Sequence, residues 1–260
     1  MTDSQAKPKV RFVWPTDTTS ASFAPVDVDV DDPQSAVTDS SEPKWKLRSR
    51  ERVANIAKYR KPAMDLRGAN ANEADTRMLV TDVLTDILGY DKYDDLTTEY
   101  RVRGDFADYG IRIDGTLVGF VEVKRAGAKL AERHMRQVEM YSVNQGTEWM
   151  ILTNGWHWKV YHLTAGLPMT VDLVLDFSIA DDHEAAVQAL QLISIESLRR
   201  REIEKVWAKQ AATNDYQLRL ALSSAGVQEA MRLELWRNTG HEVSTDEVGQ
   251  LLTRLVAGKN

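Results

Sequence analysis

Apolar positions recur at helical spacing along residues 72–89. Asn72 is a suitable N-cap, and Gly89 follows the last apolar position as a typical helix end. The stripe between them predicts one amphipathic helix, formed by Leu79, Val80, Val83, Leu84 and Ile87.

Beyond this helix the period changes to the alternation of strands. Strands are predicted over 97–103, 107–113 and 116–124, the last two joined by an Asp-Gly hairpin turn at 114–115. A helix over 130–144 and two strands over 148–153 and 156–163 follow. This order predicts an α/β or α+β core with a central mixed sheet flanked by helices.

Composition divides the chain into four regions. Residues 1–43 hold three basic and eight acidic residues without a helical period, which predicts an acidic disordered tail. Residues 44–67 reverse the balance, with nine basic against two acidic residues, and we assign 44–69 to a basic linker or helix. It could bind phosphate, pair with the acidic tail or be a solvated connector. The folded core spans 70–177, and helical patterns over 182–212, 213–238 and 243–257 make 178–260 a helical C-terminal region.

The 260 residues include no cysteine, which excludes disulfides, thiolate metal sites and a cysteine nucleophile. The first residues lack the apolar stretch of a signal peptide, and no apolar run reaches the roughly 20 residues of a membrane span. We therefore expect a cytoplasmic protein that does not contact membranes. The net charge of −6 argues against indiscriminate coating of nucleic acid, but it is compatible with a nuclease, whose site is itself acidic.

Two charged residues interrupt the apolar strand 116–124. Glu122 and Lys124 are two positions apart, so both point to the same face. Burying such charges is costly unless they are paired, metal-bound or functional. Regular pairing across the 114–115 turn places Asp108 opposite Val121, and a bulge or a one-residue shift would bring Asp108 level with Glu122.

Two carboxylates, a backbone carbonyl and water form the oxygen shell that Mg²⁺ prefers. A lysine beside them can hold a nucleophilic water and stabilise developing negative charge. The set therefore suits metal-assisted phosphodiester hydrolysis. The spacing alone is weak, because an interstrand Glu–Lys pair on a solvated sheet face would produce it too.

The surrounding motifs are more specific, and with them the chain resembles the PD-(D/E)xK nucleases. The similarity is to the N-terminal nuclease domain of type I restriction enzyme R subunits and its stand-alone relatives, over roughly residues 70–177. The motifs that carry it are Asn72-Glu73-Ala74-Asp75-Thr76-Arg77, Leu88-Gly89-Tyr90, Ala107-Asp108-Tyr109, Val121-Glu122-Val123-Lys124, Gln137 with Tyr141, and Leu152-Thr153-Asn154-Gly155 followed by Trp158.

The resemblance implies roles for the residues that match it. Asp108, Glu122 and the carbonyl of Val123 would bind Mg²⁺, with Mn²⁺ as an alternative, and Lys124 would be the catalytic lysine. Ala107 stands where the family's proline is expected, a substitution that this branch tolerates.

Further positions are expected to support the site. By the resemblance, Glu73 would add a carboxylate beside the metal, although a helix N-terminal carboxylate would look the same. Gln137 and Tyr141 match a Q-x-x-x-Y element that would face DNA or the lysine, unless they belong to an ordinary helix surface. Arg103 and Arg136 could line a DNA groove.

The sequence thus favours a Mg²⁺-dependent DNA endonuclease acting in restriction-modification, defence or DNA processing. One alternative is a non-catalytic DNA-binding or regulatory module, and another is an interaction subunit on the same fold. Because the chain contains no G-x-x-x-x-G-K-[ST] motif, we expect translocation to be absent from it. A motor or a methyltransferase could act in trans, and a homodimer is also open.

Overall fold

The computed structural model describes residues 42–102, 105–131, 134, 146–166 and 169–256. Two basic helices come first, α1 (Lys44–Ala54) and α2 (Ala57–Gly68). The helix predicted from residue 72 follows as α3 (Glu73–Asp82), which continues into one π-helical turn, η1 (Val83–Ile87). The side chain of Asn72 accepts a hydrogen bond from the N–H of Asp75, which confirms the predicted N-cap.

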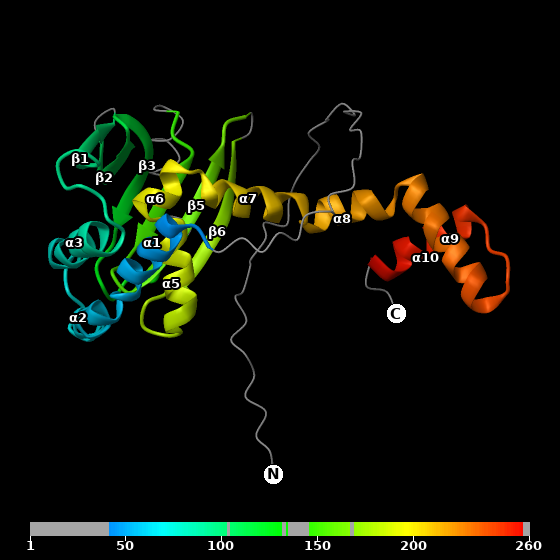
Figure 1. Ribbon diagram of the computed structural model, residues 1–260, viewed down its shortest axis with the longest axis horizontal. Coiled ribbons are helices and arrows are strands. Elements are labelled where there is room, and N and C mark those ends of the chain that lie inside the picture. Colours follow the sequence, from blue (N-terminus) through cyan, green and yellow to red (C-terminus); the bar gives the residue numbers. More distant parts are fainter. Residues whose placement is uncertain (1–41, 103–104, 132–133, 135–145, 167–168, 257–260) are drawn as a thin grey trace, which may run out of the picture. The chain divides into compact units, whose positions relative to one another are not determined.

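A six-stranded mixed sheet forms the centre of the fold (Figure 1). Its strands lie in chain order, β3 and β4 pair in parallel, and all other neighbours are antiparallel. This confirms the mixed α/β sheet and is consistent with a PD-(D/E)xK-like fold. The strands are β1 (Leu96–Val102), β2 (Asp105–Ile113), β3 (Thr116–Val123), β4 (Trp149–Thr153), β5 (His157–Thr164) and β6 (Thr170–Ser178).

Strand β6 is absent from the sequence prediction. Its apolar residues do alternate with Asp172 and Asp176, but the pattern follows directly on a predicted strand and lacks a compact hairpin signal. The predicted helix over 130–144 falls almost entirely on residues outside the described part of the chain.

The register between β2 and β3 changes once. Ile113 faces Thr116 as the hairpin turn requires, but beyond Arg112 the pairing shifts, so that Tyr109 faces Val121. The bulge uses one extra residue of β3, Val118. Continued by one step, the shifted register sets Asp108 level with Glu122 instead of Val121. The regular pairing was therefore wrong over this stretch, and the bulged alternative is the one that the protein adopts.

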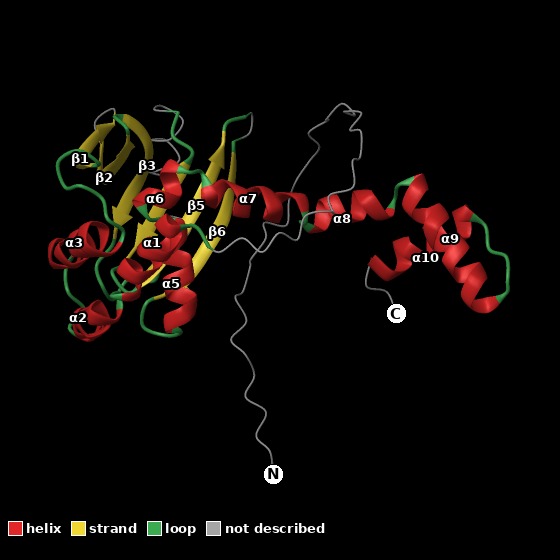
Figure 2. Ribbon diagram, in the orientation of Figure 1, coloured by secondary structure: helices red, strands yellow, loops and turns green. Residues whose placement is uncertain are grey.

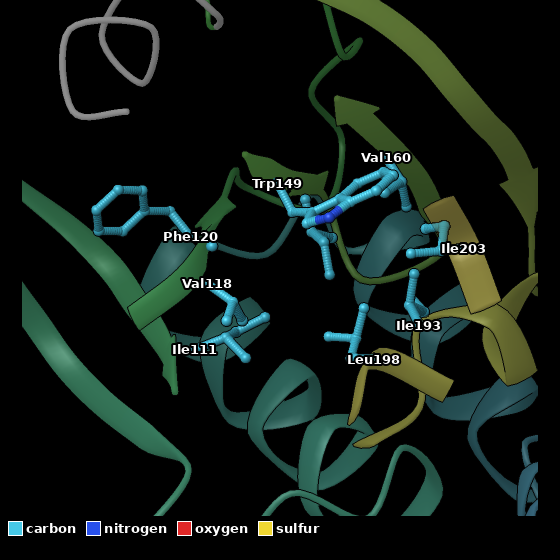
Figure 3. A pocket seen from close by; sticks show the side chains of 10 residues that line it. Ile111, Val118, Phe120, Trp149, Val160, Ile193, Leu198 and Ile203 are labelled. Atoms are coloured by element: carbon cyan, nitrogen blue, oxygen red, sulfur yellow. The ribbon is translucent and has the colours of Figure 1, made fainter. Parts of the chain in front are cut away.

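Two apolar layers cover the sheet. One face carries a buried cluster that includes Phe120, Met150 and Leu152. The other face packs against α5 (His183–Leu192) and α6 (Ile195–Arg199), where helices and strands lie in separate layers (Figure 2). A small cavity between the layers has a wholly apolar lining, so it belongs to the core and offers no chemistry (Figure 3). Its lining consists of Ile111, Val118, Gly119, Phe120, Trp149, Ile151, Val160, Ile193, Leu198 and Ile203.

Helices α1 and α2 are held to the core by their own charges. Arg52 forms a two-pronged ion pair with Glu196 of α6, with both N–O distances at 2.6 Å, and also donates to the carbonyls of Ile87 and Leu88. Further along the segment, ion pairs join Arg50 to Glu184 and Lys58 to Asp86. Much of the positive charge of residues 44–67 is therefore neutralised within the protein, and the segment is a docked pair of helices instead of a solvated connector.

The chain divides into two compact units after Ile203. Helices α5 and α6, which lie in the region assigned from sequence to the C-terminal helices, pack within the first unit. The second unit consists of α7 (Glu202–Ala212, which starts before the division), α8 (Asp215–Leu222), α9 (Ala225–Thr239) and α10 (Thr245–Val256). Among the described helices, none is long and apolar enough to cross a membrane.

Candidate active site

The end of β3 and the adjacent part of β2 bring together three of the residues singled out by sequence. The carboxylate of Asp108 accepts a hydrogen bond of 2.7 Å from the backbone N–H of Val123. Glu122 and Lys124 are the two chain neighbours of Val123, and Lys124 Nζ lies 2.5 Å from Glu122 Oε1. Asp108, Glu122 and Lys124 thus share one small region at the end of β3.

Glu122 is the most deeply buried charge of this group. Its side chain is 6% exposed, and Oε2 is buried without a hydrogen-bond donor among the described residues. Burial raises the pKa of Glu122, the bond from Lys124 opposes this rise, and the charges of Asp108 and Glu73 add to it. A buried carboxylate oxygen with an unused lone pair is a costly feature that a bound cation would relieve.

Asp108 is engaged at both oxygens. Val123 donates to Oδ2, and Arg77 of α3 donates to Oδ1 over 3.1 Å. Burial raises the pKa of Asp108, while the Val123 N–H and the positive charges of Arg77 and Lys124 counteract it. Sequence reasoning gave Arg77 no role, because its distance from Asp108 depends on how α3 packs against the sheet.

The chemistry of these donors fits a hard divalent cation. Two carboxylates, one of them with a buried oxygen that accepts no hydrogen bond from the described residues, lie together at the end of β3. The Glu73 charge reaches both carboxylates, but its own side chain is exposed. Within the described ranges, no group of three His, Cys, Asp or Glu side chains is placed to hold a metal ion. The metal-ligand roles of Asp108, Glu122, Val123 and Glu73 thus stay predictions.

Four of the expected supporting residues lie outside the described part of the chain. These are Arg103, Arg136, Gln137 and Tyr141. Their roles stay predictions as well.

The loop that follows Lys124 is held between two turns of the first unit. Arg125 Nη1 donates to Asn70 Oδ1 at 2.5 Å, the Ala126 N–H donates to the Ala71 carbonyl, and the Ala126 carbonyl accepts from Trp156 Nε1. A Cβ atom at position 127 would collide with the side chain of Asn70, so a larger residue there would have to displace that side chain.

An exposed arginine from α2 joins this loop. The guanidinium of Arg67 lies 3.9 Å from the ring centroid of Trp156. Arg67 and Arg125 are both exposed, and within the described residues neither forms an ion pair with a carboxylate. Sequence reasoning missed these two arginines, because their placement depends on tertiary contacts, of Arg67 with Trp156 and of Arg125 with Asn70.

Part of the chain that contains this site matches a known protein family. Residues 72–167 match the family model described as type I restriction enzyme R protein N terminus. No curated protein and no solved structure is significantly similar to the chain. The matched stretch contains α3, the five strands from β1 to β5, and all three residues at the strand ends. The match links this part of the protein to a nuclease-related role in restriction. Residues 72–167 are therefore similar to the N-terminal domains of type I restriction enzyme R proteins.

Proposed function

We propose that the protein is a Mg²⁺-dependent deoxyribonuclease that hydrolyses DNA phosphodiester bonds. The observation that carries the proposal is the buried, donor-free Oε2 of Glu122 beside Asp108 and Lys124. A structural Glu–Lys pair would not need a second carboxylate nearby, because the single lysine already balances the charge of Glu122. The family match supports the same function.

In this proposal each residue has a separate task. Asp108 and Glu122, with the carbonyl of Val123, hold the divalent ion, and Glu73 contributes negative charge from the start of α3. When bound, the ion supplies an activated water and neutralises charge on the phosphate. Lys124 positions that water and stabilises the developing charge, which requires that its ammonium turn from Glu122 toward the phosphate. Val123 fixes the orientation of Asp108 through its N–H.

DNA would lie across the end of β3. Arg67 and Arg125, which are exposed and form no ion pair with a carboxylate among the described residues, offer positive charge to phosphates beside the site. Four further residues stay in the proposal as DNA contacts on the strength of sequence, namely Gln137, Tyr141, Arg103 and Arg136.

A second function is favoured by a different observation. Both oxygens of Asp108 already accept hydrogen bonds from the protein, as they would in a site that had become structural. The protein would then be a non-catalytic DNA-binding or regulatory subunit. In either case, a motor or methyltransferase acting in trans is the kind of partner that restriction implies, and a second copy of the chain is another. Co-purification and light scattering test these partners directly.

The deciding experiment is incubation of the protein with supercoiled plasmid DNA and Mg²⁺. We expect nicked or linear product, loss of product with EDTA, and restored product with excess Mg²⁺ or Mn²⁺. Glu122→Gln, purified in the same way, controls for contaminating nucleases. DNA binding without any cleavage under these conditions, in the parent and the variant alike, would support the non-catalytic function instead.

A further inference from the structure

We propose that Arg77 is the internal cation of this metal site, and that it passes from Asp108 to Glu99 when a divalent ion binds. The inference deepens the proposed function, on which it rests. It assigns a role to Arg77, which the matched motif contains without a stated task, and to Glu99, which lies outside the motifs.

The guanidinium of Arg77 supplies to Asp108 the positive charge that a bound metal ion would otherwise supply. Its Nη1 atom donates to Asp108 Oδ1 over 3.1 Å, and the Asp108 side chain is 17% exposed. Together with Lys124 on Glu122, Arg77 thus provides each of the two carboxylates with one protein cation. A divalent ion binding the same oxygens would be repelled by both cations, so Arg77 must leave Asp108 for the ion to enter.

The carboxylate of Glu99 lies within reach of the Arg77 guanidinium. The same Nη1 atom is 3.9 Å from Glu99 Oε1, so a small rotation of the guanidinium exchanges one carboxylate for the other. Glu99 is also level with Asp108, because Thr98 pairs with Tyr109 and Tyr100 pairs with Ala107 on either side. Arg77 therefore stands between two carboxylates on adjacent strands.

The backbone at Glu99 points to a function for this position. Its φ angle is +50°, in the left-handed region that residues with a side chain rarely adopt. The strain interrupts the ladder of β1 directly across from Asp108. Strained residues of this kind gather at functional sites. Because the Glu99 side chain is 72% exposed, it can receive Arg77 without a change in packing.

The backbone of Arg77 is held by hydrogen bonds, so the proposed motion involves only its side chain. The Tyr109 hydroxyl donates to the Arg77 carbonyl, and Thr81 contacts both that carbonyl and the Tyr109 hydroxyl. Helix α3 is thereby held to β2 while the guanidinium remains free to select a carboxylate. The two positions differ in which strand Arg77 binds, and only one of them leaves Asp108 open.

The test is calorimetric titration of Mn²⁺ into the full chain without DNA. Arg77→Gln removes the competing cation, so we expect its Kd to fall about tenfold below that of the parent. Glu99→Gln removes the alternative position for Arg77, so its Kd should rise several-fold. The double variant should match Arg77→Gln alone, because Glu99 acts through Arg77. Arg125→Gln measures the general effect of losing one positive charge near the site.

The outcomes separate this inference from the proposed function. A parent protein that binds no Mn²⁺ would overturn both. A parent that binds Mn²⁺, with Arg77→Gln no tighter than Arg125→Gln, would overturn the role of Arg77 and leave the nuclease proposal standing. If Glu99→Gln weakened binding equally in the Arg77→Gln background, Glu99 would act by its own charge, and the transfer would be refuted. Melting curves without metal show whether each variant is folded.

Discussion

The carboxylate of Asp108 accepts a hydrogen bond from the backbone N–H of Val123, the residue between Glu122 and Lys124. This one bond ties Asp108, inside β2, to the end of β3. The Val123 N–H is therefore satisfied by the Asp108 carboxylate, which is held in the site by this bond. The bulge at Val118 makes the bond possible, because without it Asp108 would be level with Val121.

Lys124→Gln should lower the cleavage rate by a factor of about 10² to 10³, the range found when a group that stabilises transition-state charge is removed. Glutamine keeps an N–H donor for the buried Glu122, whereas alanine would leave that carboxylate without a partner. Single-turnover cleavage and thermal melting measure the two effects. Lys129→Gln, at an exposed position five residues along the chain, is the matched control and should cleave normally. A Lys124→Gln protein as active as this control would contradict the catalytic role.

Asp108→Asn should remove most of the stabilisation that Mg²⁺ or Mn²⁺ confers on the parent. An ion that binds only the folded state adds roughly 2–3 kcal/mol at a hundredfold excess over its Kd. Asparagine keeps an oxygen for the Val123 N–H, so the strand contact survives while the ligand charge is lost. The measurement is the shift in melting temperature with each ion. Lys124→Gln should retain the shift, and an equal shift in Asp108→Asn would show that Asp108 is not a ligand.

Neutralising Arg67 and Arg125 together should weaken binding to duplex DNA and reduce its salt dependence. Each lost phosphate contact lowers the log–log slope by about 0.9. Fluorescence anisotropy over a series of salt concentrations gives both quantities. The matched control is Arg50→Gln with Lys58→Gln, because those charges are already paired with Glu184 and Asp86. Should the control pair reduce the slope as much as Arg67 and Arg125 do, these two arginines would have no special part in DNA binding.

Glu196→Gln should destabilise the protein at neutral pH by roughly 1–2 kcal/mol, because it breaks the charged bonds from Arg52 that hold α1 to α6. Burial acts to raise the pKa of Glu196, but Arg52 outweighs it and holds the pKa below its usual value. The stabilisation is therefore present above the unfolded pKa of about 4.3 and is lost as pH falls through the lower folded value.

Urea unfolding of the parent and Glu196→Gln from pH 7 to pH 3 checks this sign. The difference between the two proteins should shrink as the solution becomes acidic. Lys61→Gln, which breaks an exposed pair with Asp65, should change stability by less than about 1 kcal/mol at any pH. A gap between parent and Glu196→Gln that widened toward acid would contradict the assignment.

The sequence by itself determined the elements and the chemical identity of the site. The apolar stripe after Asn72, the hairpin at residues 114–115 and the alternation in β3 are local patterns, so the helix and five of the six strands could be predicted. Glu122 and Lys124 stand out because two charges on a buried strand need a reason, and the motifs around them pointed to the family that residues 72–167 match.

Only the tertiary structure decided how these residues meet. Which residue of β3 Asp108 faces depends on one extra residue in that strand, Val118. No local pattern specifies this bulge, because regular and bulged pairings satisfy the same alternation. The basic segment looked free for phosphate, yet Arg52 pairs with Glu196, 144 positions away in the chain. Arg77 and Glu99 reach Asp108 from α3 and β1. Such contacts follow from packing between distant elements, and packing is a property of the whole fold.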